Sequence, residues 1–411
     1  MQFISVLLVI ILFTSCTQTK EELYIPDDLE TIQINVEEAG ILNMSDFIFD
    51  IEYIPLESPD GRPIGRIRKF LINDSYLGFY DEARKSVWGY TKDGEYVNEV
   101  IIPEGKGPGE LENFEDVILT EQGEIHALGS FKIVVYDIRG NFIDETSFDF
   151  LIYNFEYISS TEEYVGSTEN ETMYGFLQNE HAGHNLFYFN KEGSITKSSL
   201  PILNGREEMG FKVPNRFPVL RDQKMFFPYL VDVIYKVTDS TVIPRYHLDY
   251  GINSIPEFVF DRRKNYSPVT EGRIEFFEEE LVSNGYISFL EFFLETDLFI
   301  HLQISTGENR FTVIYNKQTE ETKVGSGRLK NDIDYNYVPF FFESHDNALY
   351  TIIEANDLLR HLNEIYENEP EKYADPRMER LRELGYSLND NSNPILQIAS
   401  FKTEGLSDKV N

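Results

Sequence analysis

The chain has 411 residues, with 71 acidic and 36 basic side chains, and its formal net charge is −35 at pH 7. This charge excludes nucleic acid as an expected partner, because binding to phosphates needs a basic surface. The single cysteine excludes an intramolecular disulfide and a cysteine-rich zinc site. Stability must therefore come from the burial of a core, to which the 14% aromatic content contributes large apolar areas.

Residues 1–15 are predicted to form a signal peptide. Residues 3–15 are almost wholly apolar, and this run is shorter than the roughly 20 residues that span a bilayer as a helix. Small residues stand directly before Cys16, the only cysteine in the chain. This arrangement resembles the lipobox of bacterial lipoproteins, in which the cysteine is acylated after cleavage. One departure is that no Lys or Arg precedes the apolar run.

Residues 16–30 are predicted to be a flexible polar tether between a lipid on Cys16 and a folded domain. The charged run Lys20-Glu21-Glu22 soon after the cysteine has two interpretations. It is similar to the surface-export signal of Bacteroidota lipoproteins, and it also fits an ordinary charged tether. The membrane, reached through this lipid, is the one partner that the N-terminal sequence predicts.

Residues 31–405 contain a repeated β unit. Each copy has a strand, a break, a strand that ends in an aromatic residue, a tight turn and a further strand. The marker aromatic residues are Tyr90, Tyr136, Phe189, Tyr235 and Tyr315. They are 46, 53, 46 and 80 residues apart. Because a period near 45 residues is typical of one four-stranded blade per repeat, the pattern predicts a β-propeller.

A sixth copy of the unit begins at residues 348–353 and resumes at residues 395–401, so the expected fold is all-β with six blades. Two insertions break the period, at about residues 270–284 and 356–385. Both are predicted to be helical, and the second has Leu358, Leu362 and Ile365 at helical spacing. We expect this second insertion to cap a face of the propeller.

The N-terminal residues 47–57 alternate in polarity like a strand. They precede the first copy of the repeat, so we expect them to pair with the last blade and to close the ring. A closing strand from the N-terminus would protect strand edges that are otherwise open. Residues 406–411 are predicted to be a short tail.

The stretch Glu104-Gly105-Lys106-Gly107-Pro108-Gly109-Glu110 has the glycine content of a phosphate loop. A Walker loop, however, needs Gly-Lys-Ser/Thr at the start of a helix. Here no hydroxyl residue follows Lys106, and the next apolar run, Val117-Ile118-Leu119, has the pattern of a strand. The stretch is therefore interpreted as a sharp link between two β units.

Together these elements resemble the six-bladed β-propeller lipoproteins of Bacteroidota, which are relatives of NHL-type and TolB-like propellers. The resemblance rests on residues 54–57 (Ile-Pro-Leu-Glu), residues 64–67 (Ile-Gly-Arg-Ile) and residues 104–110, followed by the repeats, and it covers about residues 45–405. It implies a cell-envelope lipoprotein without an established general activity, and it carries no catalytic residues to transfer. The sixth blade departs most from the pattern, because of its helical insertion.

Loops at the ends of inner strands are where propellers bind ligands. The candidate ligand-binding residues in such loops are Lys106, Glu110, Arg216, Arg221 and Tyr229. The alternative for each is a role on the surface or in packing. Glu180, His181 and His184 are of metal-ligand type, but they lie in a polar excursion between strands and are interpreted as an exposed loop.

Two functions are compatible with the sequence. The first is a binding scaffold for a small molecule, glycan, peptide or envelope protein on an outer membrane lipoprotein, either surface-exposed or facing the periplasm. The alternative is a propeller-type lyase or hydrolase with a metal or polar site on the central axis. No Gly-x-Ser-x-Gly elbow and no cofactor motif is present. No cofactor, metal site or catalytic residue is therefore predicted, and binding is favoured over catalysis.

Overall fold

The computed structural model describes residues 26, 28–173, 175–177, 180–210, 213, 215–221, 223–337, 340–389 and 391–402. The predicted signal peptide at residues 1–15, the acylation site Cys16 and the predicted tail at residues 406–411 lie outside this range. Most of the predicted tether lies outside it as well, and its last residue, Glu30, is the first residue of a strand.

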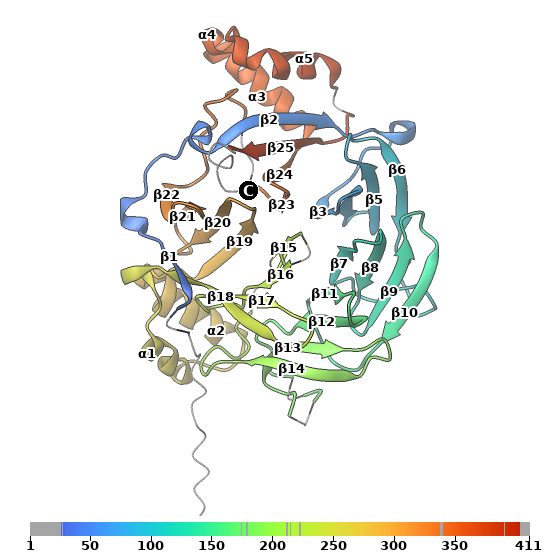
Figure 1. The fold of residues 1–411 in the computed structure, drawn as a ribbon, viewed down its shortest axis with the longest axis vertical. Helices are drawn as coiled ribbons and strands as arrows, with labels where there is room; N and C mark the ends of the chain where they lie inside the picture. Colours follow the sequence, from blue (N-terminus) through green and yellow to red (C-terminus); the bar gives the residue numbers. More distant parts are fainter. Residues whose placement is uncertain are drawn as a thin grey trace, which may run out of the picture.

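Within the described range, the strands form six sheets arranged around a central axis (Figure 1). Five sheets have four strands and one has five. Each sheet begins with a strand near the axis, and these first strands contact their neighbours at the centre. The chain is thus mostly strand in a propeller-like arrangement, as the repeat predicts.

The strand bounds follow the chain around the axis. Sheet 1 contains β3 (Ile67–Ile72), β4 (Tyr76–Asp81), β5 (Ser86–Thr91) and β6 (Tyr96–Ile101). Sheet 2 contains β7 (Asp116–Leu119), β8 (Glu124–Leu128), β9 (Lys132–Asp137) and β10 (Phe142–Ser147). Sheet 3 contains β11 (Asn154–Ile158), β12 (Glu163–Ser167), β13 (His184–Phe189) and β14 (Ile195–Pro201).

The remaining sheets include strands from both ends of the chain. Sheet 4 contains β15 (Val219–Leu220), β16 (Gln223–Phe226), β17 (Val233–Val237), β18 (Val242–Asp249) and, at its outer edge, β1 (Glu30–Gln33). Sheet 5 contains β19 (Phe289–Glu295), β20 (Phe299–Ser305), β21 (Arg310–Asn316) and β22 (Glu321–Ser326). Sheet 6 contains β23 (Glu343–His345), β24 (Ala348–Ile353), β25 (Ile395–Phe401) and β2 (Ile48–Pro55).

Tight turns connect the outer strands of the sheets. In the turn between β9 and β10, Asp137 Oδ1 accepts hydrogen bonds from the backbone N–H groups of Arg139 (2.9 Å) and Asn141 (2.8 Å). In the turn between β13 and β14, Gly193 has a φ of 77°, and a Cβ there would lie 1.9 Å from the carbonyl oxygen of Ser147. Both the left-handed backbone and this close approach require glycine.

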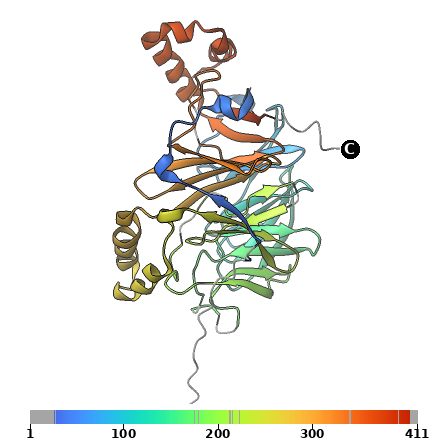
Figure 2. The same ribbon diagram turned by 60° about the vertical axis from the view of Figure 1, so that its left-hand side comes forward.

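The N-terminal arm, residues 30–55, runs past sheets 4, 5 and 6. Its first strand, β1, pairs with β18 in parallel, and its last strand, β2, pairs with β25 in antiparallel orientation. Between them, Gly40 forms a single bridge to Gly325 in β22, and Asn43 forms one to Lys330, which follows β22. Figure 2 shows the arm lying along the outside of these sheets. The predicted strand at residues 47–57 is therefore present as β2 in the last sheet, whereas β1 was not predicted.

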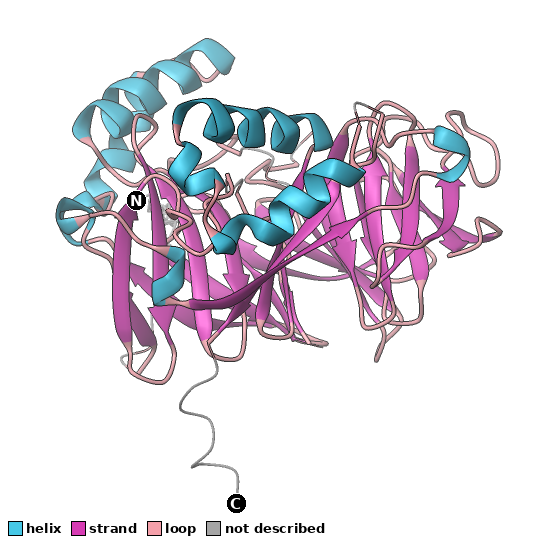
Figure 3. Ribbon diagram, turned by 90° about the horizontal axis from the view of Figure 1, so that it is seen from above, coloured by secondary structure: helices cyan, strands magenta, loops and turns pink. Residues whose placement is uncertain are grey.

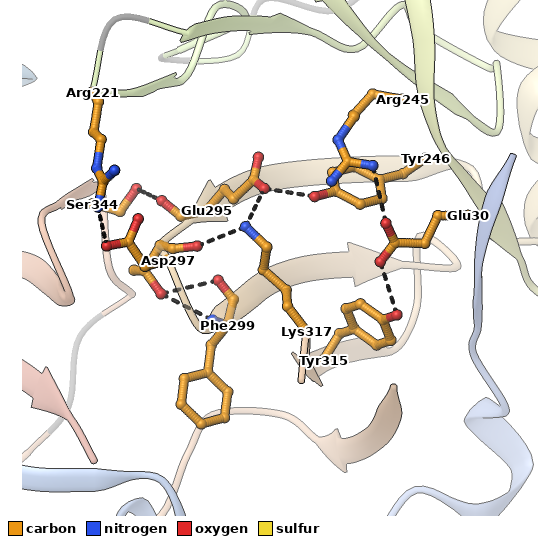
Figure 4. Close-up of polar contacts among 11 residues, drawn as sticks. Glu30, Arg221, Arg245, Tyr246, Glu295, Asp297, Phe299, Tyr315, Lys317 and Ser344 are labelled. Carbon is orange, nitrogen blue, oxygen red and sulfur yellow. Dashed lines mark hydrogen bonds and ion pairs between the residues drawn. The ribbon is translucent and has the colours of Figure 1, made fainter. Parts of the chain in front are cut away.

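Side chains fasten the start of this arm. Glu30 forms an ion pair with Arg245 on β18 (3.0 Å) and accepts a hydrogen bond from the hydroxyl of Tyr315 on β21 (2.9 Å). Figure 4 shows Glu30 between these two groups. Glu30 thereby links β1 to sheets 4 and 5 at once.

The α-helices of the described residues fall in two insertions. The first, between β18 and β19, begins before the predicted residues 270–284 and holds α1 (Glu257–Phe260) and α2 (Thr270–Phe276). The second, between β24 and β25, holds α3 (Ala355–Asn368), α4 (Pro370–Tyr373) and α5 (Glu379–Ser387). Figure 3 shows the helices gathered on one side of the strands. Leu358, Leu362 and Leu381 pack with Ile51 of β2 in one core cluster. The second insertion therefore covers the rim of sheet 6 and extends outward from the ring, instead of lying over the axis (Figure 1).

None of the helices in the described residues is both long and apolar enough to cross a membrane.

Candidate functional site

The first strands of five sheets line a polar cavity on the central axis. Two adjoining hollows, of about 100 Å³ and about 60 Å³, share Lys69 in their walls. Together they are called the axial cavity. Its walls come from β3, β7, β11, β15 and β23, and include Lys69, Asp116, Asn154, Glu156, Asn215 and Glu343. Since a space of about 10–15 Å³ admits one water, both hollows can hold a small polar group.

A buried ion pair crosses the axial cavity. Lys69 Nζ on β3 lies 2.7 Å from Asp116 Oδ1 on β7, and only 12% and 4% of these two side chains are exposed. Asp116 Oδ2 also accepts hydrogen bonds from the Phe155 N–H (3.3 Å) and from Asn154 Nδ2 (3.4 Å) on β11. This cluster therefore ties the first strands of sheets 1, 2 and 3 together.

The side chain of Asn154 contains a hydrogen-bond acceptor that has no donor among the described residues. The side chain is 5% exposed and lines the larger hollow. Its Oδ1 atom has no hydrogen-bond partner among the described residues. A buried polar atom without a partner costs about 1–3 kcal/mol, which a ligand that donates a hydrogen bond there would recover.

Two carboxyl groups line the smaller hollow without a basic partner. Glu343 accepts hydrogen bonds from Asn215 Nδ2 (3.0 Å) and from the backbone N–H of Ser344 (3.0 Å). Glu156 accepts one from the backbone N–H of Tyr157 (2.8 Å). Neither carboxyl makes an ion pair with any residue that the structure describes.

Burial raises the pKa of both carboxyl groups. It raises the pKa of Glu343 to about 7, although the Ser344 N–H and the Lys69 ammonium group act in the opposite direction. It also raises the pKa of Glu156, against the opposing effect of Lys224. Near neutral pH, Glu343 can therefore hold or release a proton.

The basic side chains of the axial cavity are already paired. Arg68 forms an ion pair with Glu82, Lys69 with Asp116, and Arg221 with Asp297. Figure 4 shows the Arg221 pair at the end of β15. Glu156 and Glu343 differ from these groups, because neither forms an ion pair with a described residue, although Lys69 and Lys224 act on them at longer range.

Aromatic and aliphatic side chains complete the walls. Tyr80 and Phe114 stack with ring centroids 3.8 Å apart beside the larger hollow. Ile72, Leu119 and Phe217 line the smaller one. The axial cavity can therefore accept both an apolar stem and a polar head group.

Three of the residues predicted from the sequence lie in or near sheet 4. Arg216 is 1% exposed and forms a bidentate pair with Glu169, at 2.9 Å and 2.5 Å. Tyr229 is buried in the core beside the first insertion. Arg221 is exposed, pairs with Asp297 and lines the axial cavity. Of these three, Arg221 reaches the cavity, and the binding role of each stays a prediction.

The two other predicted residues lie in the link between β6 and β7. Lys106 is largely exposed and forms an ion pair with Glu112 (3.3 Å). Glu110 Oε2 accepts a hydrogen bond from the Gly107 N–H (2.8 Å), and Lys132 Nζ donates one to the Gly107 carbonyl (2.8 Å). A strand follows this stretch, so it lacks the helix N-terminus of a Walker loop. The structure does not bring Lys106 and Glu110 into the walls of the axial cavity.

Other candidate sites are less enclosed. A groove of about 800 Å³ runs between the N-terminal arm and the edges of sheets 4 and 5, with Glu37, Asp249 and Lys323 among its lining residues. It is larger than the axial cavity, but Glu37 is exposed. His184 Nδ1 lies 3.1 Å from the His181 carbonyl oxygen, and no cluster of metal-ligand type occurs in the part of the chain that is described.

The sequence contained a signal for the axial residues that the prediction did not use. Lys69, Asp116, Glu156 and Glu343 each belong to the first strand of a repeat, and Glu156 stands between two aromatic residues. A polar residue at this place in successive repeats points toward the axis of a propeller. Aligning the repeats by their first strands would have grouped these residues.

Comparison with known families identifies one that covers most of the chain. Residues 29–400 match a family described as "Domain of unknown function (DUF4934)". The chain therefore belongs to the DUF4934 family. No curated protein matches the chain in sequence.

Solved structures from Bacteroides are similar to the chain. A protein from Bacteroides fragilis NCTC 9343 that is described as exported shares 16% identity and a TM-score of 0.70, over 90% of this chain and 99% of that one. A member of the DUF4221 family from Bacteroides vulgatus ATCC 8482 shares 10% identity and a TM-score of 0.44, over 86% and 97% of the two chains. The first similarity shows a common fold and, at this identity, nothing about activity.

Proposed function

We propose that the protein is an outer membrane lipoprotein of the cell envelope whose propeller binds a ligand in the axial cavity. The lipobox-like sequence at Cys16 supports the anchor, and the fold shared with a protein described as exported is compatible with it. The segment after Cys16 bears on whether the domain faces the periplasm or the cell surface. Its run Lys20-Glu21-Glu22 is similar to a surface-export signal and also fits an ordinary tether, so the proposal includes both orientations.

The observation that carries ligand binding is the polar lining of the axial cavity. Buried Asp116 and Asn154 line a space large enough for a polar group, and the Oδ1 atom of Asn154 has no hydrogen-bond partner among the residues that the structure describes. Polar groups that converge from several rigid strands are held in fixed positions, which favours selective binding. Arg221 is proposed as a binding residue at the edge of the same cavity, because it lines the smaller hollow.

We further propose that the domain is a six-bladed propeller closed by its N-terminal strand. The pairing of β2 with β25 in sheet 6 supports this closure. Sheet 6 would then take three strands from the end of the chain and one from the start, and the two ends would hold each other in place.

Thermal denaturation of the full-length protein with panels of glycans, peptides, amines and metal ions tests ligand binding. Binding to the native state raises the melting temperature by an amount that grows with the ratio of free ligand concentration to dissociation constant. The proposal predicts that at least one class raises it, and that Asn154→Leu removes the rise. A rise that Asn154→Leu leaves unchanged places the ligand elsewhere and contradicts axial binding.

The second candidate function, a propeller-type lyase or hydrolase, has one observation in its favour. A carboxyl group with a pKa of about 7, such as Glu343, suits general acid or base catalysis at neutral pH. Turnover of a bound ligand that Glu343→Gln abolishes, while binding persists, would favour the enzyme. Binding without turnover would favour the scaffold.

A further inference from the structure

The charges in the axial cavity indicate which chemical class of ligand it takes. We propose that the axial cavity binds an aliphatic primary amine or guanidinium group, either on a free small molecule or on a basic side chain of a peptide. This inference rests on the proposed binding function and adds the ligand class to it.

The first argument is the distribution of charge. The basic side chains Arg68, Lys69 and Arg221 each have a carboxylate partner. Glu156 and Glu343 face the smaller hollow and receive hydrogen bonds from neutral amide groups. A bound cation would supply the partner that these carboxyl groups lack, because buried charges are stable when they are paired.

The second argument is the direction of the hydrogen bonds. Asn154 Oδ1 has no partner within the described residues, and it can only accept a hydrogen bond. The carboxyl oxygens of Glu156 and Glu343 are acceptors as well when they are ionised. Ammonium and guanidinium groups consist of donors alone, so they match this set, whereas a carboxylate or phosphate ligand would present acceptors to acceptors.

The third argument is the size and apolar lining of the cavity. The smaller hollow measures about 60 Å³, and Ile72, Leu119 and Phe217 stand beside the two glutamates. This space suits one cationic head group on an aliphatic stem, whose methylene groups would pack on the apolar wall. The net charge of −35 would also attract a cation toward the domain over a longer range.

Ionisation of Glu343 should couple binding to pH. The charged groups that face Glu343 are Lys69 on β3 and Glu156 on β11. The pKa of Glu343 is raised to about 7 by burial, so the carboxyl is largely protonated at pH 5.5 and largely ionised at pH 8. Because a cation binds the ionised form better, its affinity should rise with pH over this interval, and its binding should release a proton.

Isothermal titration of the full-length protein tests this inference. The probes are 1,5-diaminopentane, a pentapeptide with one central lysine, the same peptide with that lysine acetylated, a neutral oligosaccharide and an aspartate-containing pentapeptide. We expect one or both amine probes to bind, and the acetylated and acidic peptides to bind at least tenfold more weakly. Binding of the diamine indicates a free small molecule, and binding of the lysine peptide alone indicates a peptide side chain.

Two variants in the axial cavity and one control variant test where the amine binds. Glu343→Gln and Glu156→Gln should each weaken amine binding about tenfold or more, and Glu343→Gln should reduce its dependence on pH. Glu371→Gln, which removes an exposed carboxyl on α4, should leave the affinity unchanged. Thermal melts of each variant verify that it is folded.

The outcomes separate this inference from the proposed function. If the oligosaccharide or the acidic peptide binds and Asn154→Leu prevents it, axial binding stands and the cationic class is overturned. If the acetylated peptide binds as tightly as the lysine peptide, the cationic class is overturned in the same way. If amines bind equally well to both glutamine variants, the two glutamates do not hold the amine and the cationic site in the smaller hollow is overturned. If Asn154→Leu also leaves amine binding unchanged, the amine lies outside the axial cavity and both proposals fail.

Discussion

The strand β2 offers a direct test of the proposed closure of the ring. Ile51 is 2% exposed and packs in the core cluster that joins sheet 6 to the second helical insertion, whereas Phe49, on the same strand, is 76% exposed. A bulge between Ile48 and Asp50 accompanies this difference, because it interrupts the alternation of the two faces. Ile51→Ala and Phe49→Ala are therefore a matched pair of substitutions.

Ile51→Ala should lower the free energy of unfolding by about 2–5 kcal/mol, the usual cost of truncating a buried aliphatic side chain. Phe49→Ala should change it by less than about 0.5 kcal/mol, because an exposed side chain loses few contacts. Deletion of residues 31–57 removes Ile48, Ile51 and Tyr53 together with the backbone pairing to β25. These three side chains alone contribute about 5–9 kcal/mol, which is comparable to the whole stability of a domain.

Urea unfolding can be followed through the fluorescence of Trp88, the only tryptophan. Trp88 is fully buried in sheet 1, within the cluster that joins sheet 1 to sheet 6. Its fluorescence therefore reports whether a substitution in β2 also destabilises the junction between the first and last sheets. Equal effects of Ile51→Ala and Phe49→Ala, or a deletion variant that unfolds at the same urea concentration as the full chain, would refute this account of closure.

Three further predictions concern the anchor, the axis and the core. Cys16→Ala should move the protein from the membrane to the soluble fraction, and retention in the membrane pellet would contradict the lipid anchor. Burial raises the pKa of Glu343 from its ordinary value near 4.5 to about 7, so the folded state binds more protons than the unfolded state between these values. This carboxyl should therefore cost about 3 kcal/mol of stability as the pH rises from 4.5 to 7, and Glu343→Gln should flatten that slope in urea titrations, whereas an unchanged slope would contradict the shift. Glu169→Gln leaves the buried Arg216 without its carboxylate and should cost about 3–5 kcal/mol, and a loss below 1 kcal/mol in the same assay would be contrary to this reasoning.

The sequence was informative about the repeat because the marker residues occupy equivalent positions in successive sheets. Tyr90, Tyr136, Phe189, Tyr235 and Tyr315 all lie in the third strand of a sheet. The interrupted sixth copy of the repeat could also be predicted from the sequence, because β24 and β25 are both apolar. The two strands pair directly despite the helices between them. The local residue pattern was therefore sufficient to predict the strands of the repeat.

Apart from the pairing of the N-terminal strand with the last sheet, features that depend on distant contacts were not predicted from the sequence. The strand β1 is only Glu30-Thr31-Ile32-Gln33, which is too short to show a strand pattern, and it forms through parallel pairing with β18. Lys69 and Asp116, or Asn215 and Glu343, meet only because the ring brings separate first strands to one axis. Arg216 was singled out in a loop, yet its partner Glu169 is 47 residues away.

The most direct test of the central claim is a crystal structure of the protein grown with 1,5-diaminopentane at pH 8. The account predicts density for the diamine in the axial cavity, with one nitrogen within hydrogen-bond distance of Glu343 or Glu156. Density confined to another place, such as the groove beneath the N-terminal arm, would contradict axial recognition of a cation.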